Sequence, residues 1–542
     1  MREKFALLIA ALLFVLYAQA QPTPVLVKNI NPLVHSSPRY FCEMNGKLYF
    51  IAVDGSNGFD QFLWVTDGSE QGTHKVSQVK MRPYPEGVPL IENNGLLYFA
   101  AENGTGEELW VSDGTEAGTR KLKEINATSS SWPKIFVKYK NKIFFNATDG
   151  IHGEELWVSD GTESGTVMFK DIRDPGVSFP FRLLVFNNLL FFAITNSAND
   201  FELWVTDGTT NGTRKIDNSP FTEVNPFSLH GWNGKVYFSA KNDTASQLWA
   251  TDGTPSGTKP ITDTSHSVDL DPQVMTNYSG KLFFNGYYKG NQVLWCSDGT
   301  PEGTNVWRDN NDQLIYHPEN LRSTSFGLFF TAEKTPKYEN YELWITKGTK
   351  ESTKQLKDLN SLRSSYPSDF IEYHGKVYFS AAEVDNNRNM WKSDGVTVEK
   401  VIAPSTKKTM SNTIYPFFTI FNDTLFFSAD FDSLGFELYK LGTAKPKDST
   451  LTMGELNASY QLTLYPNPAG NIVNIVIDGA EMNNIHIEIY TALGELLRPQ
   501  QDYHTITTGN TCIVNTATLK KGLYFVNVTT ENIAVTRRLV IE

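Results

Sequence analysis

The stretch Glu155-Leu156-Trp157-Val158-Ser159-Asp160-Gly161-Thr162-Glu163-Ser164-Gly165-Thr166 recurs along the chain with small changes. Its tryptophan returns at spacings of 45 to 49 residues, and a tyrosine takes its place in a ninth copy: Trp64, Trp110, Trp157, Trp204, Trp249, Trp295, Trp344, Trp391 and Tyr439. A period this steady indicates one supersecondary unit repeated nine times. The sequence therefore predicts an array of similar units, while it says little about a ligand or substrate.

Each unit has the same succession of turn signals and short apolar runs. An Asn-Gly pair such as Asn94-Gly95 is the preferred two-residue hairpin turn, because both of its residues need positive φ. Asp-Gly-Thr marks a second turn after the Glu-Leu-Trp-Val strand. A proline, which fits the beginning of a strand because it lacks an N–H, opens each unit: Pro38, Pro89, Pro133, Pro180, Pro226, Pro272, Pro318, Pro367 and Pro416. Four short strands per unit without helical periodicity predict a propeller blade.

The two ends of the array predict that it closes. The ninth unit ends at Gly442 without a fourth strand, and residues 26–32 resemble residues 169–175, which belong to a fourth strand. If the N-terminal strand completes the last blade, no sheet edge is left exposed. We therefore expect an all-β fold with a β-propeller of about nine four-stranded blades, eight blades or an open arc being the alternatives, followed by a small C-terminal β-sandwich.

The composition restricts the class of protein. The chain of 542 residues has a formal net charge of −12, which argues against a nucleic-acid partner because phosphate attraction needs a basic face. Residues 1–20 combine Arg2 and Lys4, an apolar run over 5–16 and the small-x-small site Ala18-Gln19-Ala20, as in a secretory signal peptide. The cysteines, Cys42, Cys296 and Cys512, are too few for a disulfide framework, and we expect ordinary small apolar residues there.

The aspartate and glutamate of the repeated stretch invite a metal or catalytic interpretation. One such aspartate occurs per unit, so neighbouring copies lie a blade apart and do not converge as calcium ligands do. We expect the aspartate to cap its own turn, with the glycine at positive φ. The tryptophan is expected to wedge between blades, with its N–H on a carbonyl. Lys347 replaces the aspartate in the seventh unit, which otherwise persists. No metal site and no cofactor are predicted.

These repeats resemble the ELWxxDGT-repeat proteins, which are large exported bacterial proteins. The resemblance covers roughly residues 38–443 and weakens in the last three units, at Lys347, Asn389-Met390-Trp391 and Tyr439. It implies export and no settled biochemical activity.

The two faces of the predicted array differ. Asn-Gly and Asp-Gly-Thr turns form one face, which we call the uniform face. The opposite face, the variable face, carries the loops between second and third strands and the crossovers between units, and its loops differ: 195–200, 241–246, 286–291, 333–341, 384–389 and 430–436. Function favours loops on a rigid scaffold. Exposed aromatic or cationic side chains suited to sugars or protein partners are predicted there, although they could simply cover the loops: Tyr287, Tyr288, Lys289, Tyr338, Tyr341, Arg388 and Phe431.

The pattern of the tail after the repeats predicts a separate β domain. Residues 444–459 form a polar linker, and several alternating strands follow in residues 460–542. This tail resembles the type A C-terminal sorting domain of type IX secretion cargo, through Tyr465-Pro466-Asn467-Pro468, Lys521-Gly522-Leu523-Tyr524 and Arg537-Arg538. By that resemblance, Tyr465, Pro466, Asn467, Pro468, Gly522, Tyr524 and Arg537 belong to a sorting signal. It implies passage through the periplasm to the outer cell surface or the medium, with the type IX secretion machinery as a partner.

We expect residues 21–443 to act as a binding or adhesion module for a polysaccharide or a surface protein, with contact to a membrane only through surface anchoring. No nucleophile elbow, phosphate loop or clustered Cys/His motif appears. The alternatives are an extracellular hydrolase or lyase that uses carboxylates of the variable face, and a purely structural matrix component. Retaining glycosidases need two carboxylates about 5–5.5 Å apart, and sequence alone does not bring Asp430 and Asp432 together with anything.

Overall fold

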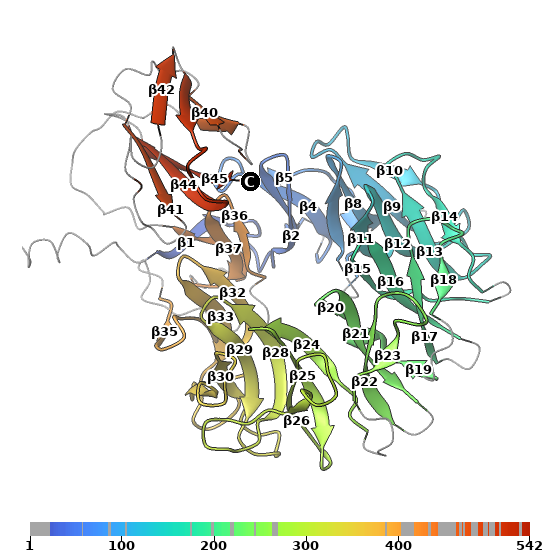
Figure 1. Ribbon diagram of the computed structural model, residues 1–542. Coiled ribbons are helices and arrows are strands. Elements are labelled where there is room, and N and C mark those ends of the chain that lie inside the picture. Colours follow the sequence, from blue (N-terminus) through green and yellow to red (C-terminus); the bar gives the residue numbers. More distant parts are fainter. Residues whose placement is uncertain are drawn as a thin grey trace, which may run out of the picture. The chain divides into compact units, whose positions relative to one another are not determined.

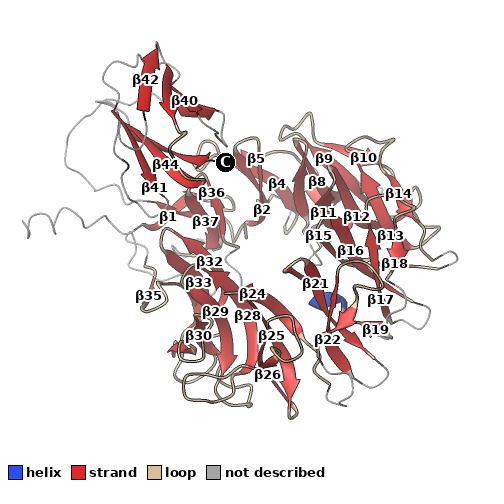
Figure 2. Ribbon diagram, viewed as in Figure 1, coloured by secondary structure: helices blue, strands red, loops and turns tan. Residues whose placement is uncertain are grey.

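The structure is a computed structural model that describes residues 22–56, 58–84, 88–102, 104, 106–173, 176–196, 200–216, 222–242, 245–262, 269–384, 387–402, 417–431, 435–442, 462–465, 469, 472–477, 486–491, 497, 504–508, 511–529 and 534–541. The predicted signal peptide and the predicted linker lie outside these residues. The chain divides into two compact units, Met1–Lys445 and Pro446–Glu542. In the described part of the chain the only helix is the 3-10 turn η1 (Pro226–Ser228), and antiparallel strands form the rest of the regular structure (Figure 2).

The third repeat shows how one unit is built. Its strands β11 (Lys134–Tyr139), β12 (Lys142–Thr148), β13 (Glu154–Ser159) and β14 (Val167–Lys170) form a sheet in that order. Lys140 and Asn141, between the first two strands, both have positive φ, as a two-residue hairpin turn requires. Every residue of β12 after Lys142 is buried, because neighbouring sheets cover both of its faces.

The same succession of strands runs through the whole first unit, sheet after sheet in chain order (Figure 1). Four-stranded sheets have the orders β11-β12-β13-β14, β15-β16-β17-β18, β32-β33-β34-β35 and β1-β38-β37-β36, and β19-β21-β22-β23 carries β20 in addition. Two larger sheets each join two neighbouring repeats, through β6, which pairs with both β4 and β8, and through the pair of Val293 and Tyr316.

The remaining strands of the first unit have the following bounds: β1 (Thr23–Lys28), β2 (Arg39–Met44), β3 (Lys47–Val53), β4 (Gln61–Thr66), β5 (His74–Lys75), β6 (Lys80–Met81), β7 (Leu90–Asn93), β8 (Leu96–Glu102), β9 (Glu107–Ser112), β10 (Arg120–Lys123), β15 (Phe181–Phe186), β16 (Leu189–Thr195), β17 (Phe201–Thr206), β18 (Arg214–Lys215), β19 (Glu223–Val224), β20 (His230–Trp232), β21 (Lys235–Lys241), β22 (Ser246–Thr251), β23 (Lys259–Pro260), β24 (Gln273–Tyr278), β25 (Lys281–Tyr288), β26 (Asn291–Ser297), β27 (Asn305–Val306), β28 (Tyr316–Thr324), β29 (Gly327–Glu333), β30 (Glu342–Thr346), β31 (Lys354–Lys357), β32 (Ser368–Tyr373), β33 (Lys376–Ala382), β34 (Arg388–Ser393), β35 (Val398–Lys400), β36 (Thr419–Phe421), β37 (Thr424–Ala429) and β38 (Glu437–Gly442).

The N-terminal strand completes the last sheet of this unit. Strand β1 pairs antiparallel with β38, from Thr23 opposite Gly442 to Lys28 opposite Leu438. Val27 and Ile30, on and just after β1, join a core cluster that draws on both the last sheet and the sheet of β3 and β4. The prediction that the N-terminal segment supplies the missing fourth strand is confirmed, with the strand itself ending at Lys28.

The repeated tryptophans are wedges between successive sheets, as predicted. Trp157 on β13 packs with Tyr98 and Leu109 of the preceding sheet. The expected hydrogen bond from indole N–H to a carbonyl forms at Trp295, to Gly286 O at 3.2 Å, and at Trp344, to Ala332 O at 3.0 Å. It is wrong for four others, whose Nε1 has no hydrogen-bond partner among the described residues: Trp64, Trp110, Trp157 and Trp391.

The proline prediction needs two corrections. Pro133, for example, directly precedes β11, as expected. Pro226 instead opens the helix η1, where a missing N–H costs nothing. Pro318 lies inside β28, whose register shifts on both sides of Glu319 leave room for a residue that cannot donate to the ladder. Pro416 lies outside the described residues.

The second unit contains two antiparallel sheets. One has the order β39 (Leu462–Tyr465), β40 (Ile472–Ile477), β43 (Thr511–Asn515), β42 (His504–Thr508), and the other has the order β41 (His486–Thr491), β44 (Gly522–Thr529), β45 (Ala534–Ile541). One apolar cluster takes Val473 and Val514 from the first sheet and Ile489, Val526 and Leu539 from the second. The unit therefore has a core of its own.

Candidate functional site

The aspartate of the repeated stretch is a turn cap. In the third repeat, Asp160 Oδ1 accepts hydrogen bonds from Thr162 N at 2.9 Å and Thr162 Oγ1 at 2.7 Å, and Gly161 has φ of 95°. These hydrogen bonds lower the pKa of Asp160. The same pair of bonds occurs at Asp113, Asp252 and Asp298. The structural interpretation of this residue is therefore confirmed.

The second glycine of the stretch belongs to the same turn. A Cβ on Gly165 would lie 2.1 Å from both carboxylate oxygens of Asp160, so the capping side chain needs a glycine beneath it. In the seventh repeat Lys347 replaces the aspartate and Ser352 replaces this glycine. There the Ser352 hydroxyl accepts the hydrogen bond from Lys347 N at 2.9 Å. Aspartate and glycine thus form one device, and the seventh repeat changes both together.

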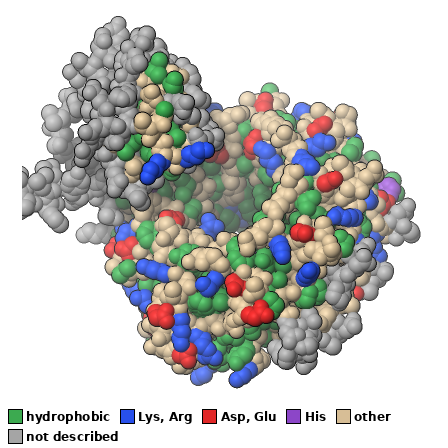
Figure 3. Space-filling view, in the orientation of Figure 1, with side chains coloured by type: hydrophobic (Ala, Val, Ile, Leu, Met, Phe, Trp, Pro, Cys, Tyr) green, Lys and Arg blue, Asp and Glu red, His purple; other side chains and the backbone are tan. Residues whose placement is uncertain are grey.

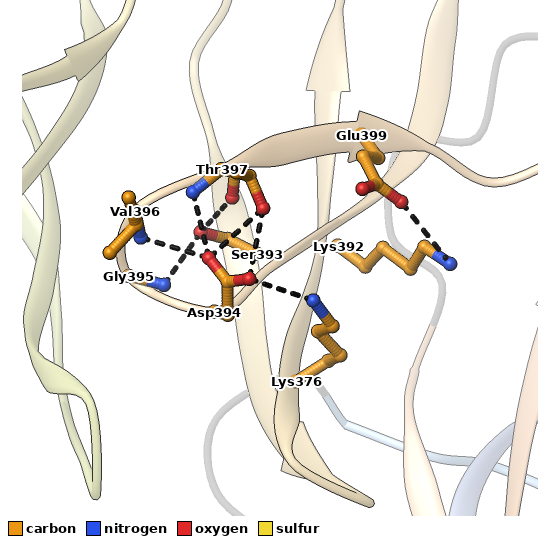
Figure 4. Close-up of polar contacts among 8 residues, drawn as sticks. All are labelled: Lys376, Lys392, Ser393, Asp394, Gly395, Val396, Thr397 and Glu399. Carbon is orange, nitrogen blue, oxygen red and sulfur yellow. Dashed lines mark hydrogen bonds and ion pairs between the residues drawn. The ribbon is translucent and has the colours of Figure 1, made fainter. Parts of the chain in front are cut away.

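The eighth repeat adds an ion pair to this turn. Asp394 accepts from Val396 N, from Thr397 N and Oγ1, and from Lys376 Nζ at 2.9 Å (Figure 4). These contacts hold the pKa of Asp394 far below its usual range, the bond from Lys376 first among them. Within the described ranges, no group of three or more His, Cys, Asp and Glu side chains could hold a metal ion. The repeated aspartates therefore stabilise the turns of the uniform face.

The glutamate of the Glu-Leu-Trp strand caps the crossover to the next repeat, a role that the sequence did not indicate. Glu155 is fully buried, and its carboxylate accepts from Ser178 Oγ at 2.6 Å, Ser178 N at 2.9 Å and Ile172 N at 3.3 Å. Three other crossovers make equivalent contacts. In each, a serine hydroxyl and the backbone N–H of an isoleucine or leucine donate to a buried glutamate: Glu108, Glu342 or Glu437. Burial raises the pKa of all four, to about 7 at Glu342 and Glu437. The available signal was a serine six residues after an isoleucine or leucine, as in Ile30 and Ser36.

Two of the predicted ligand-binding residues are not exposed. Phe431 is 1% exposed and packs edge-on against Tyr439, inside the core of the last repeats. Tyr341 is 5% exposed and stacks on Tyr366. In both cases the loop turns an apolar ring inward to cover the end of a sheet, so the expectation of exposure is wrong there. Arg388 is only partly exposed, and its Nη2 donates to Tyr366 O, Ser368 Oγ and Ser380 Oγ, each at 2.8 Å.

The other four predicted residues reach the surface to different degrees. Tyr338 is 62% exposed. Tyr287 and Tyr288, at the end of β25, are half-buried, and Tyr288 packs edge-on against Trp295. Lys289 is exposed, and its Nζ lies 5.3 Å from the centre of the Tyr288 ring. These residues lie in the sixth and seventh repeats.

The exposed aromatic side chains of several repeats lie on the variable face. All five large aromatic residues classed as exposed among the described residues lie on loops between second and third strands or on crossovers: Phe59, Trp132, Phe227, Tyr338 and Tyr366. Only Tyr338 was singled out from the sequence. Trp132 and Tyr366 each precede the proline of a new repeat, at φ of 48° and 44°. Their position before a repeat-opening proline was a signal that could have found them.

A cavity of about 290 Å³ lies on the same face, around the helix η1. Phe201 and Phe227 contribute apolar surface, while Glu223, Lys241 and Asp271 contribute charge. The Asp271 carboxylate accepts from Gln273 Nε2 at 2.6 Å and from Ser239 Oγ at 3.2 Å. The crossover that leads from the fifth repeat to the sixth, which carries Asp271, has no capping glutamate. Gln247 stands at the corresponding position of the fifth repeat.

Burial disfavours the reactive thiolate form of the two cysteines whose side chains are described. Burial raises the pKa of both Cys42 and Cys296 to about 11, and both are free thiols. Cys512 is on β43, and its side chain lies outside the described set.

The predicted sorting residues lie at different places in the second unit. Tyr465 ends β39, and Pro466, Asn467 and Pro468 lie outside the described residues. Gly522, which opens β44, has φ of 153°. Tyr524 is buried, and its hydroxyl donates to Lys520 O at 2.9 Å. Arg537 stands opposite Val526 in the ladder of β44 and β45.

Residues 463–542 match the family model of the secretion system C-terminal sorting domain. The match confirms the resemblance of the tail to a type IX sorting domain. It implies that the protein is secreted or exported to the cell surface and that it interacts with the type IX secretion machinery. No helix among the described residues is long and apolar enough to cross a bilayer.

The comparisons with other proteins give the following matches. No curated protein matches the chain. Similar solved structures include a puromycin hydrolase (12% identity over 68% of this chain and 60% of that chain, TM-score 0.36) and the β-propeller domain of the Trilobed protease from Pyrococcus furiosus (11%, 68% and 98%, 0.33). Oligopeptidase B from Leishmania major is another (10%, 83% and 54%, 0.37). The chain spans less than two thirds of the two hydrolytic enzymes, and at these TM-scores we transfer no property from any of the three.

Proposed function

We propose that the protein is an exported binding or adhesion module that recognises a polysaccharide or a surface protein through its variable face. The observation that carries the proposal is that all five large aromatic residues classed as exposed among the described residues lie on that face. Contiguous exposed apolar patches mark interaction sites, and aromatic residues are enriched at protein interfaces relative to the rest of the surface. Tyrosine and tryptophan are also the side chains that contribute most to binding energy at interfaces.

The scaffold of this module is a closed β-propeller of nine blades formed by residues 21–443, of the ELWxxDGT-repeat class. The pairing of β1 with β38 supports closure, and apolar clusters between successive sheets support the blade arrangement. Residues 444–459 are then a linker, and residues 460–542 are a small β-sandwich that directs the protein to the type IX secretion machinery. Residues 1–20 are the signal peptide that takes the chain into the periplasm.

Charge at the surface supports a ligand that is not a polyanion. Lysine, arginine, aspartate and glutamate side chains are interspersed over the first unit on the side seen in Figure 3. In the eighth repeat Lys376 also neutralises the turn aspartate Asp394. Surfaces that recognise polyanions instead concentrate one sign of charge.

Among the residues predicted from the sequence, Tyr338, Tyr287, Tyr288 and Lys289 are the ones that we propose contact the ligand. The test is a panel of soluble polysaccharides and isolated cell-surface proteins against the purified protein, with binding and the release of reducing ends measured in parallel. Binding without release is the expected result. Release of reducing ends would replace this proposal with an extracellular hydrolase or lyase, and absence of any binding would refute recognition by this face.

A further inference from the structure

Four rings follow one another across the seventh and eighth repeats, a set that we call the aromatic row. The ring of Tyr338 stacks on that of His317, with 3.7 Å between centroids and 24° between planes. His317 lies 6.1 Å from Tyr341, and Tyr341 stacks on Tyr366 at 4.9 Å and 25°. The two inner rings are buried, whereas Tyr338 and Tyr366 are 62% and 46% exposed.

Buried hydrogen bonds hold this row in place. His317 Nδ1 lies 2.6 Å from Glu333 Oε2, and both side chains are almost fully buried. The Glu333 carboxylate also accepts from three successive backbone N–H groups of the loop, those of Tyr338, Glu339 and Asn340. The ring on which Tyr338 stacks and the backbone that carries Tyr338 are therefore fixed by the same carboxylate.

The outer ring at the other end is fixed in a different way. Tyr366 adopts φ of 44° just before Pro367, and its N–H donates to Tyr341 O at 3.2 Å. Its carbonyl accepts from Arg388 Nη2 at 2.8 Å. Rings that are ordered before binding lose little conformational entropy when a ligand arrives. Each outer tyrosine also has one face covered by a neighbouring ring, so the opposite face is the side available to a ligand.

The charges around the row balance. Lys334 and Lys337 precede Tyr338 on the exposed loop, and Glu339 follows it. Glu319 lies on β28 in the same repeat. Glu333 and Arg388 contact the row directly, so three positive and three negative side chains surround it and create no net attraction for an acidic polysaccharide. Flat apolar faces combined with phenol hydroxyl groups suit the C–H faces and hydroxyl groups of a neutral sugar.

We propose that the aromatic row is a subsite for a neutral saccharide chain, with Tyr338 and Tyr366 as its two stacking platforms. This inference rests on the proposed function and specifies the ligand class and the repeats that bind it. The row contributes contact area, and neighbouring loops of the variable face would add hydrogen bonds.

The test measures the binding of a soluble neutral glucan, a soluble neutral mannan and a polyuronate to the full-length exported protein and to four variants. Tyr338→Ala and Tyr366→Ala are each expected to weaken binding of at least one neutral polysaccharide about tenfold. Tyr338→Phe keeps the ring and should bind within about twofold of the unchanged protein, because stacking carries the contact. Val396→Ala is the control and should leave binding unchanged, since it removes an exposed apolar side chain from the turn between β34 and β35 on the uniform face.

The outcomes separate this inference from the proposed function. Neutral-polysaccharide binding that survives both tyrosine-to-alanine changes, or binding of the polyuronate alone, would overturn the aromatic row as a neutral-sugar subsite and leave a binding module. Binding of a surface protein alone would do the same. Absence of any ligand in the whole panel would overturn both.

Discussion

The buried carboxyl of Glu437 should make stability depend on pH. It accepts from Ile30 N at 2.7 Å and Ser36 Oγ at 2.6 Å, and thereby ties the last repeat to the segment that follows β1. Burial, the largest cause, raises its pKa from 4.5 to about 7. A carboxyl whose pKa is higher in the folded state stabilises the fold fully below the unfolded pKa, and that contribution is lost as pH rises through the folded pKa.

The size of the effect follows from the shift. Each pKa unit corresponds to about 1.4 kcal/mol, so a rise from 4.5 to about 7 gives a loss of about 3 kcal/mol across that window for this one group. Glu437→Gln keeps the shape and an acceptor oxygen but removes the ionisation. At about pH 5 the variant should match the unchanged protein in free energy of unfolding, and at about pH 8 it should be the more stable of the two.

Urea unfolding at the two pH values measures this directly. Glu342→Gln is the matched control, because Glu342 makes the same contacts to an interior crossover and its pKa is also raised to about 7. Each change should remove a similar part of the pH dependence. If Glu437→Gln leaves the difference between the two pH values unchanged, the carboxyl is not protonated in the folded protein at neutral pH and the reasoning fails.

Three further predictions concern the repeat, its closure and its thiols. Gly165→Ser should destabilise by about 1–3 kcal/mol because its Cβ meets the Asp160 carboxylate, and the double change with Asp160→Lys should recover most of the loss in thermal unfolding, as the seventh repeat implies. Additive effects would contradict the coupling. Deletion of residues 22–32 should lower the melting temperature sharply, since it removes β1, and an unchanged melt would exclude closure by that strand. Cys296 should resist alkylation at neutral pH until the protein unfolds, and mass spectrometry of the native protein would detect any exception.

Sequence reasoning predicted the features whose causes are local. Asp160 caps a turn only two residues away, and the hairpin between β11 and β12 needs two adjacent residues of positive φ. The period of the tryptophan fixed the length of the unit, and β1 was recognisable because its residues resemble an internal fourth strand. The turn signals are complete within a dozen residues, and the repeat period is found by comparing the chain with itself. No tertiary information was needed to interpret either.

The site depended on distances that sequence does not contain. Glu155 contacts Ser178 across 23 residues, and only the crossover geometry brings the two together. Tyr338 and Tyr341 are three residues apart on one loop, yet one ring is exposed and the other is buried. Loop side chains have no fixed period that separates inward from outward positions, unlike the side chains of a strand. Aromatic residues on such loops were therefore identified as a class, but not sorted by exposure.

Repetition itself separates structural residues from candidates for recognition in this chain. A residue that recurs in most repeats, such as Asp160 or Glu155, finds its partner within its own turn or crossover. The combination of stacked rings in the aromatic row belongs to the seventh and eighth repeats, where the repeated stretch has begun to change. Substitution of Tyr338 should consequently alter binding and leave the melting temperature nearly unchanged. Glu155→Ala, in the third repeat, should do the reverse, because it removes the carboxylate that accepts hydrogen bonds from Ile172 N, Ser178 N and Ser178 Oγ. These two opposite results are expected only if the repeated positions stabilise the scaffold and the residues of the aromatic row determine what it binds.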